Sequence, residues 1–302
     1  MKQLFIIGCP RSGTTYLLRL LASNQQFSWV SNKLNNDPQN YALSEELKMF
    51  DNVFSGKKKY FEAHNSHYAM PFPVEPWLFW NAHYPYFQWN AKHFFTPRNG
   101  NVSDVEGTQI QKIRTAVDQI NNTSGRVHFL SKYTDFPRIN LLLKAFPDAK
   151  FVHLIRDGRA VANSYHKKIE SGEFKTSAEE DNWVSAWPEE WQKDYKEKFH
   201  NPLAFTLYQW KFFLDEIKNE IKTVNPNQIL EVKYSDMIKD TMKFTQEILD
   251  FAGLKMDGSM KKFIKKKPGD NKNNKWQEKL TEAEKTLYSQ ILSEERFQEL
   301  LD

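Results

Sequence analysis

The feature that most constrains the fold is a glycine-bounded loop near the N-terminus. Four apolar residues, Leu4 to Ile7, run without alternation, as in a parallel strand that is buried on both faces. Gly8-Cys9-Pro10-Arg11-Ser12-Gly13 then interrupts regular structure, and Thr14 to Ala22 carries leucines at helical spacing. The sequence therefore predicts a strand, a loop and a helix, which form the first unit of an α/β sheet.

Strand and helix signals continue to alternate along the chain. After the first unit, strand signals lie at 127–130, 151–155 and 229–232, and helix signals lie at 105–121, 137–147, 158–165, 203–224, 242–252 and from Thr281 onward. This alternation predicts an α/β fold, a three-layer P-loop-type parallel sheet with helices on both faces. We expect residues 1–302 to form a single domain.

Composition excludes several classes of protein. Hydrophobic residues make up 40% and charged residues 26% of the 302, close to globular averages, which excludes disordered and collagen-like chains. The single cysteine, Cys9, excludes an internal disulfide framework. No apolar run approaches the length of a membrane span, and the first apolar run is too short for a signal peptide. We expect a soluble, cytoplasmic protein.

Two segments depart from the average composition. An aromatic-rich excursion occupies residues 66–100, with ten aromatic residues between Phe72 and Phe95. A basic segment at 255–279 holds nine lysines and three acidic residues, a local charge of +6 that leaves −2 for the rest of the chain. Such a patch predicts an anionic ligand. Nucleic acid is not expected, because aromatic residues do not interleave with the lysines.

The N-terminal loop is one residue away from the nucleotide-binding pattern GxxxxGK[ST]. Thr14 occupies the lysine position of that pattern, and Arg11 supplies a cation three residues earlier. Backbone N–H groups and the helix dipole make such a loop a cradle for anions. A P-loop kinase would need the missing lysine on its phosphates, so this substitution argues against the kinase alternative.

A second basic motif follows the strand signal at 151–155. Arg156 begins the run Arg156-Asp157-Gly158-Arg159, and Ser164 lies two helical turns further on. Arginine and serine can bind one phosphate together, since guanidinium groups pair with phosphate and hydroxyl groups donate to it. Considered alone, the motif is equally consistent with a structural Arg–Asp pair at the start of a helix.

Together the two motifs resemble those of the sulfotransferases that use 3′-phosphoadenosine 5′-phosphosulfate (PAPS) as co-substrate. The resemblance implies that Arg11, Ser12, Gly13, Thr14 and Thr15 cradle the 5′-phosphosulfate of PAPS. It implies that Arg156 and Ser164 bind the 3′-phosphate, that Tyr234 lies near the adenosine, and that the basic segment, including Lys267, closes over the nucleotide. The scheme requires no metal, and no group of His, Asp and Glu residues has metal-ligand spacing.

The catalytic residues follow less directly. Lys132, in Ser131-Lys132-Tyr133-Thr134, looks like the lysine of the family's "KTP" region, and we expect it and Arg11 to stabilise the leaving group. A general base must take the acceptor proton. Where one branch of the family carries a glutamate, this chain has no carboxylate (29–32). Glu75 is the first choice, followed by Glu46 and His67.

The acceptor is the least determined partner. The aromatic segment could line an acceptor pocket or form a satellite core, and its members are Trp77, Phe79, Trp80, Tyr84, Tyr86, Phe87 and Trp89. We expect sulfuryl transfer to a hydroxyl or amine of a small molecule or carbohydrate. The alternatives are a P-loop nucleotide kinase and a non-catalytic module that binds adenosine 3′,5′-bisphosphate. Nothing in the sequence indicates an oligomeric state.

Overall fold

The computed structural model describes residues 2–48, 71–84, 107–134, 136–172, 183–266 and 271–298. Most of the aromatic segment lies outside these ranges, as do His67 and Lys267. No helix among these ranges is both long and apolar enough to cross a membrane.

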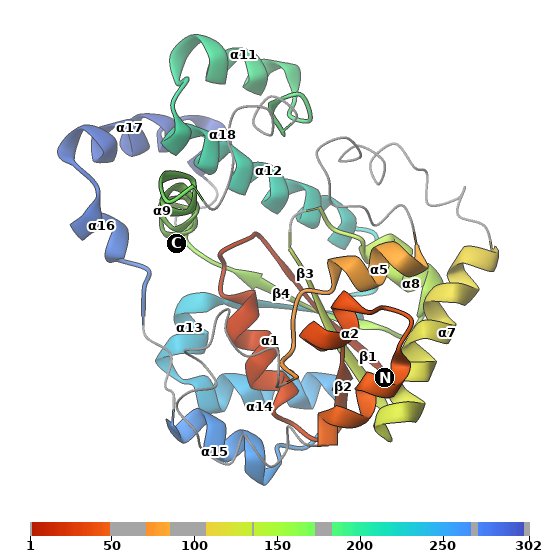
Figure 1. Cartoon of the computed structure of the whole chain (residues 1–302). Helices are drawn as coiled ribbons and strands as arrows, with labels where there is room; N and C mark the ends of the chain where they lie inside the picture. The colour runs from red at the N-terminus through yellow and green to blue at the C-terminus, as the bar shows by residue number, and fades with distance from the viewer. Residues whose placement is uncertain are drawn as a thin grey trace.

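The described residues form a five-stranded sheet in which each pair of neighbours is parallel. The strands, in sheet order, are β2 (Phe27–Trp29), β3 (His128–Thr134), β1 (Gln3–Gly8), β4 (Lys150–Ile155) and β5 (Ile229–Lys233). β1 is central, and its register sets Ile6 opposite Lys132 on one side and Val152 on the other. The chain builds one half of the sheet before crossing β1 to build the other (Figure 1). The resulting switch point lies beside β1, where open α/β sheets bind ligands.

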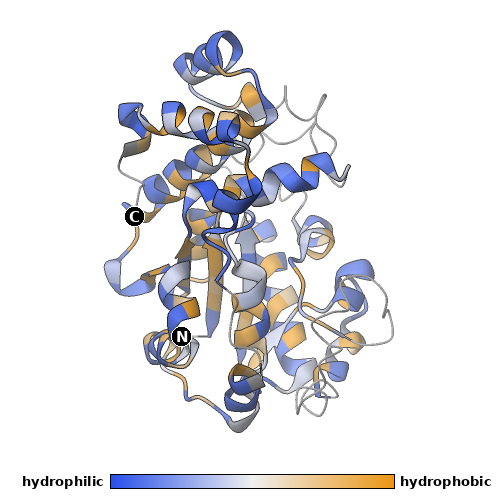
Figure 2. Cartoon of the chain, turned by 90° about the vertical axis from the view of Figure 1, so that its left-hand side faces the viewer, coloured by the Kyte–Doolittle hydropathy of each residue, from blue (hydrophilic) through white to orange (hydrophobic). Residues whose placement is uncertain are grey.

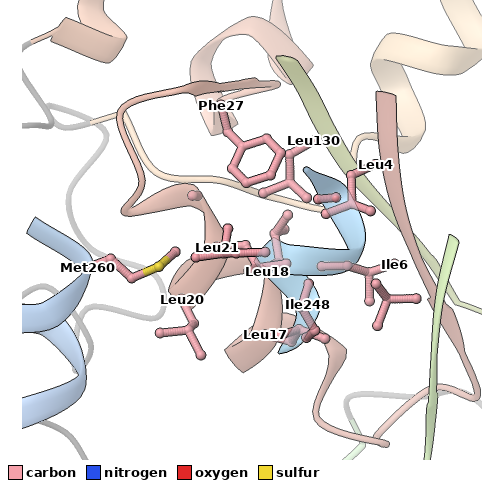
Figure 3. Packing of buried hydrophobic residues seen from close by; sticks show 14 of the residues in the cluster. Leu4, Ile6, Leu17, Leu18, Leu20, Leu21, Phe27, Leu130, Ile248 and Met260 are labelled. Atoms are coloured by element: carbon pink, nitrogen blue, oxygen red, sulfur yellow. The ribbon is translucent and has the colours of Figure 1, made fainter. Parts of the chain in front are cut away.

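One face of the sheet is covered by α1 (Thr14–Ala22), α14 (Thr241–Ala252) and α15 (Gly258–Lys266). Leu17, Leu18 and Leu21 of α1 lie among side chains of the strands and of α14, and Leu20 is directed toward α15 (Figure 3). All four leucines are buried, as the helical spacing of the sequence predicts.

The opposite face is covered by α7 (Gly107–Ser124), α8 (Ile139–Ala145) and the short α5 (Trp77–His83). Because side chains alternate along a strand, Phe5 and Ile7 of β1 point to this face whereas Leu4 and Ile6 point to the other. The strands are therefore buried on both sides. Figure 2 shows the hydrophobic strands at the centre, between helices that mix hydrophobic and hydrophilic residues.

A third hydrophobic cluster lies beyond the sheet. It joins α9 (Gly158–Glu170), α11 (Glu189–Lys198), α12 (Pro202–Ile221), α17 (Glu282–Leu292) and α18 (Glu295–Gln298). Its aromatic members include Trp183, Trp187 and Trp191, all nearly buried, with Trp187 stacked on Tyr208 of α12. The sequence suggested surface loops or short helices here, and the burial of these tryptophans corrects the surface assignment.

The remaining elements are short connectors. They are α2 (Asn32–Asn36), η1 (Tyr41–Glu46), η4 (Pro226–Gln228), α13 (Tyr234–Lys239) and α16 (Lys275–Lys279). The predicted parallel sheet between two layers of helices is confirmed. Its first loop and the motif after β4 end side by side at the carboxyl edge of the sheet, which is the edge where the candidate site lies.

Candidate functional site

The loop between β1 and α1 has the backbone that an anion cradle requires. Gly13 precedes α1 at φ 96°, and Arg11 has φ 70°, a left-handed conformation uncommon for a residue with a side chain. A Cβ at Gly13 would lie 2.8 Å from the ring of Tyr234, so only glycine fits there. No side chain caps α1 and its first turn carries no acid, so the positive end of the helix dipole has no acidic residue of α1 beside it.

Arg11, which belongs to this loop, contacts both Arg156 and Ser164. The Arg156 Nη1 donates to the backbone carbonyl of Arg11 at 2.8 Å. The Arg11 Nε donates to the Ser164 Oγ at 3.1 Å, so Ser164 connects α9 to the two arginines. Residues that are 153 positions apart thus form one cationic site, and the serine is where the second motif needs it to be.

Tyr234, the first residue of α13, completes the site directly after β5. The Arg156 guanidinium lies 4.4 Å above the centre of its ring, and Gly13 packs beneath the same side chain. Arg156 is 8% exposed, and burial lowers its pKa; its hydrogen-bond partners are neutral oxygens of Arg11 and Asn273. A buried guanidinium bound to neutral oxygens has capacity to bind an anion.

Asp157 and Gly158 fix the turn that carries Arg156. The Asp157 carboxylate accepts from the backbone N–H of Arg159, which caps α9, and pairs with the Arg159 side chain at 2.7 Å. A Cβ on Gly158 would lie 2.4 Å from the Trp210 ring of α12, so the turn can approach α12 only at a glycine. The structural alternative therefore describes Asp157 and Arg159, whereas Arg156 contacts Arg11 and Asn273 instead of Asp157.

Lys132 and Glu75 lie at the neighbouring strand end. The Lys132 Nζ is 2.7 Å from the Glu75 Oε2, and both side chains are largely buried. The Glu75 Oε1 accepts from the Thr134 backbone N–H at 2.6 Å and from its hydroxyl at 2.7 Å. Thr134 pairs with Gly8 across β1 and β3, so this carboxylate sits beside the first residue of the loop.

The segment that carries Glu75 is held against the end of β2. Ser31 and Pro73 form a β-bridge, and the Val74 N–H donates to the Val30 carbonyl at 3.4 Å. The Asn32 side chain accepts from the Phe72 N–H at 2.9 Å. Residues 72–75 of the aromatic segment therefore lie against the chain that follows β2, and this contact places Glu75 beside Lys132.

The other predicted residues have varied positions. Ser12 is buried in the loop, and Thr14 is buried at the start of α1, where Thr15 is half-buried. Glu46 is paired with Lys33 at 2.7 Å, so it is engaged away from Lys132. Lys267 and His67 lie outside the described residues.

The described aromatic residues divide into two groups. Three of them are buried in the core, as the satellite-core alternative predicts: Phe79, Trp80 and Tyr84. Trp77 is half-buried, with the Arg138 guanidinium 4.9 Å from its ring centre. Its neighbour Leu78 is 53% exposed. Residues 85–100 lie outside the described ranges.

Two residues at the site, Thr134 and Asn273, were not predicted from the sequence. Thr134 binds Glu75, and Asn273 Oδ1 accepts from the Arg156 Nε at 3.0 Å. Thr134 stands two residues after Lys132, on the same strand face, which is a usable signal. Asn273 lies in the basic segment, where the sequence pattern indicates only the lysines as ligand contacts. Within the described ranges, no group of three or more His, Cys, Asp or Glu side chains could hold a metal ion.

The fold and the site together define a P-loop-type α/β protein in which two arginines, a serine and a tyrosine gather at the switch point of the sheet. A family model described as "Sulfotransferase family" matches residues 3–258. The chain therefore belongs to the sulfotransferase family, whose members transfer sulfuryl groups.

Solved structures support the fold. Sulfotransferase STF1 from Mycobacterium tuberculosis H37Rv is 17% identical with a TM-score of 0.58, over 99% of this chain and 77% of that one. Sulfotransferase STF9 from Mycobacterium avium is 16% identical with a TM-score of 0.55, over 96% of this chain and 76% of that one. At these identities the likeness shows a shared fold. A comparison with curated proteins gave no significant match.

Proposed function

We propose that this protein transfers a sulfuryl group from PAPS to a hydroxyl or amine of a small-molecule or carbohydrate acceptor. The observation that carries the proposal is the meeting of Arg11, Arg156, Ser164 and Tyr234 at the carboxyl edge of the sheet. They come from three separate segments of the chain, and Arg11, Arg156 and Ser164 supply hydrogen-bond donors suited to phosphate.

The loop from Arg11 to Thr15 binds the 5′ end of the donor in this proposal. The N–H groups at the start of α1 and the Arg11 guanidinium supply the positive potential. Arg156 and Ser164 bind the 3′-phosphate, and Tyr234 borders the adenosine while supporting Arg156. Lys267 adds a further cation from the basic segment. PAPS supplies the activated sulfuryl group, and the protein supplies position and charge.

Transfer itself needs a proton acceptor and a cation. The Glu75 Oε1 is anchored by Thr134, which leaves Oε2, the oxygen beside Lys132, to take the acceptor proton. As the acceptor oxygen or nitrogen bonds to sulfur, the bond from sulfur to the bridging phosphate oxygen breaks. Negative charge then develops on the departing nucleotide, and Lys132 and Arg11 offset it. No metal is part of this scheme.

Acceptor binding is assigned to the surface around Trp77. Its half-buried ring and the exposed Leu78 form an apolar surface two residues beyond Glu75. Apolar or ring-shaped acceptors suit such a surface, since aromatic side chains pack against both aliphatic and sugar rings.

The first test is a thermal-shift comparison of adenosine 3′,5′-bisphosphate with ADP and with ATP–magnesium. A ligand at 100 times its Kd adds about 2.7 kcal/mol to stability, enough for a clear rise in Tm. We expect stabilisation by the bisphosphate alone. Stabilisation by ATP–magnesium instead would support the kinase alternative and contradict the proposal.

The second test separates an enzyme from a binding module. The protein is incubated with labelled PAPS and a panel of phenols, alkyl alcohols, amines and sugars, and label transfer is followed. We expect transfer to at least one class, and a Glu75→Gln variant that binds nucleotide without transferring label. Binding of the bisphosphate without transfer to any class, and without slow transfer to water, would favour the non-catalytic module.

A further inference from the structure

Residues 273–276, which follow α15 in the chain, contact both arginines of the motif that follows β4. The Asn273 Oδ1 accepts from the Arg156 Nε at 3.0 Å, and the Arg159 guanidinium lies 4.8 Å from the centre of the Trp276 ring. Figure 1 shows α16 beside α9, in agreement with these two contacts. A stretch more than 110 residues away in sequence is therefore docked on the turn that presents Arg156.

The Arg156 guanidinium is held by two hydrogen bonds at its edge and by an aromatic ring against one face. A guanidinium carries five N–H groups in a fixed planar fork. Asn273 takes the Nε group, the Arg11 carbonyl takes one Nη1 group, and the Tyr234 ring covers a face of the plane. Among the hydrogen bonds within the described residues, this leaves the two Nη2 groups and the second Nη1 group for a ligand. These form the end of the fork, where a phosphate can bind through two oxygens.

The chemistry of Asn273 matters as much as its position. Its amide oxygen orients Arg156 without neutralising it, because the amide carries no charge. An aspartate there would also accept from Nε, but its charge would pair with the guanidinium and repel a phosphate dianion. Lys272 and Lys275 flank Asn273 and add positive potential. The lysines of this segment thus attract anions in general, whereas the uncharged Asn273 orients the Arg156 guanidinium.

We propose that Asn273 is a positioning residue that sets the specificity of the donor site for a nucleotide bearing a 3′-phosphate. It acts through Arg156, whose guanidinium it turns so that the free end of the fork faces the ligand. This inference rests on the proposed function, because it takes the 3′-phosphate to be the anion that Arg156 binds.

The test compares two nucleotides on three variants of the full-length chain. Kd values are measured for adenosine 3′,5′-bisphosphate and for adenosine 5′-monophosphate, which lacks the 3′-phosphate. The variants are Asn273→Ala, the isosteric Asn273→Asp, and the control Asn274→Ala. Asn274 is an exposed neighbour whose side chain makes no capping hydrogen bond.

We expect Asn273→Ala to weaken the bisphosphate by roughly 3- to 10-fold, the loss of one orienting hydrogen bond, and to leave the monophosphate within about 2-fold. Asn273→Asp should weaken the bisphosphate by more than about 10-fold, because it adds charge repulsion to the same loss. Asn274→Ala should leave both affinities within about 2-fold. Unchanged Tm values without ligand would show that the variants fold.

The ratio of the two affinities separates the possible failures. If the wild-type chain does not prefer the bisphosphate, the assignment of Arg156 in the proposed function fails, and this inference fails with it. If the wild type shows the preference and Asn273→Ala retains it, the positioning role alone is overturned. An equal loss for both nucleotides also overturns it, because a general structural defect does not select for the 3′-phosphate.

Discussion

The two carboxylate oxygens of Glu75 have different partners. Thr134 holds Oε1, and Oε2 is left beside the Lys132 ammonium. We expect Glu75→Gln to lower kcat by roughly 10²- to 10⁴-fold, because an amide of the same shape cannot take the acceptor proton. Steady-state kinetics with saturating PAPS measures the effect. Glu46→Gln, which alters another ion-paired glutamate, is the control, and equal kcat values for the two variants would contradict the base assignment.

Lys132 is expected to act mainly on turnover. Lys132→Ala removes the cation beside the developing charge, so kcat should fall by about 10²-fold or more while the Kd of adenosine 3′,5′-bisphosphate changes much less. Parallel measurement of kcat, KM and nucleotide Kd tests this separation. A change confined to the KM of the acceptor would show that the lysine binds the acceptor and does not act on the leaving group.

The residue scale also shows what sequence could predict. Arg11 and Arg156 were found because each belongs to a local motif whose spacing carries meaning, and the structure brings them together. Pairing of Glu75 with Lys132 was not predicted, although both residues were candidates, because 57 residues separate them. Asn273 was missed because a single asparagine in a basic segment has no local signature.

At the scale of elements, α9 packs along α12 and approaches it most closely at a glycine, Gly158. Gly158→Ala would place a methyl group 2.4 Å from the buried Trp210 ring, and the backbone must move to relieve the contact. We expect a loss of roughly 1–3 kcal/mol in the free energy of unfolding and weaker binding of the bisphosphate, since Arg156 stands on the same turn. Chemical denaturation and nucleotide titration measure the two effects.

Gly258→Ala provides the matched comparison for that variant. Gly258 also begins a helix, and a Cβ there would have no neighbour within 4 Å. It should be neutral or slightly stabilising, because alanine is the better helix former. If both glycine variants lose the same stability, crowding against Trp210 is not the cause.

Elements with a long apolar run were predicted well, and short or mixed elements were not. The bounds of α1 agree with the sequence, and β1 and β4 extend their apolar runs by one or two residues. β2 was missed, because three residues in a polar stretch give no periodic signal. β3 extends past its apolar run to Thr134, because its last four residues are mostly polar and give no apolar signal. These failures fall where function or tertiary packing decides the residue type.

For the whole molecule, His83 links stability to pH. Its ring donates from Nδ1 to the Phe79 carbonyl at 2.7 Å and accepts at Nε2 from the Tyr41 hydroxyl. This arrangement suits the neutral imidazole, so the folded chain favours the neutral form of His83. Burial lowers the pKa of His83 below its ordinary value of 6.5. The unfolded chain therefore takes up the proton first on acidification, and this contribution to stability is present above about pH 6.5 and is lost as pH falls below it.

Free energies of unfolding at pH 7.5, 6.5 and 5.5 test this linkage. The wild type should lose more stability between pH 7.5 and 5.5 than His83→Gln does, by about 1.4 kcal/mol for each unit of pKa difference. His200→Gln, at an exposed position, should follow the wild type. Parallel curves for the wild type and His83→Gln would show that another group governs the acid response.

The long connection between Arg156 and Asn273 has a consequence for how the protein is made. At a synthesis rate of about 5–20 residues per second, the 117 residues between them take roughly 6 to 23 s to appear. Throughout that interval a growing chain on the ribosome holds the arginine, and later every strand of the sheet, but not the amide that orients the guanidinium. Ligand recognition is therefore among the last properties that the nascent chain acquires, well after its sheet can form.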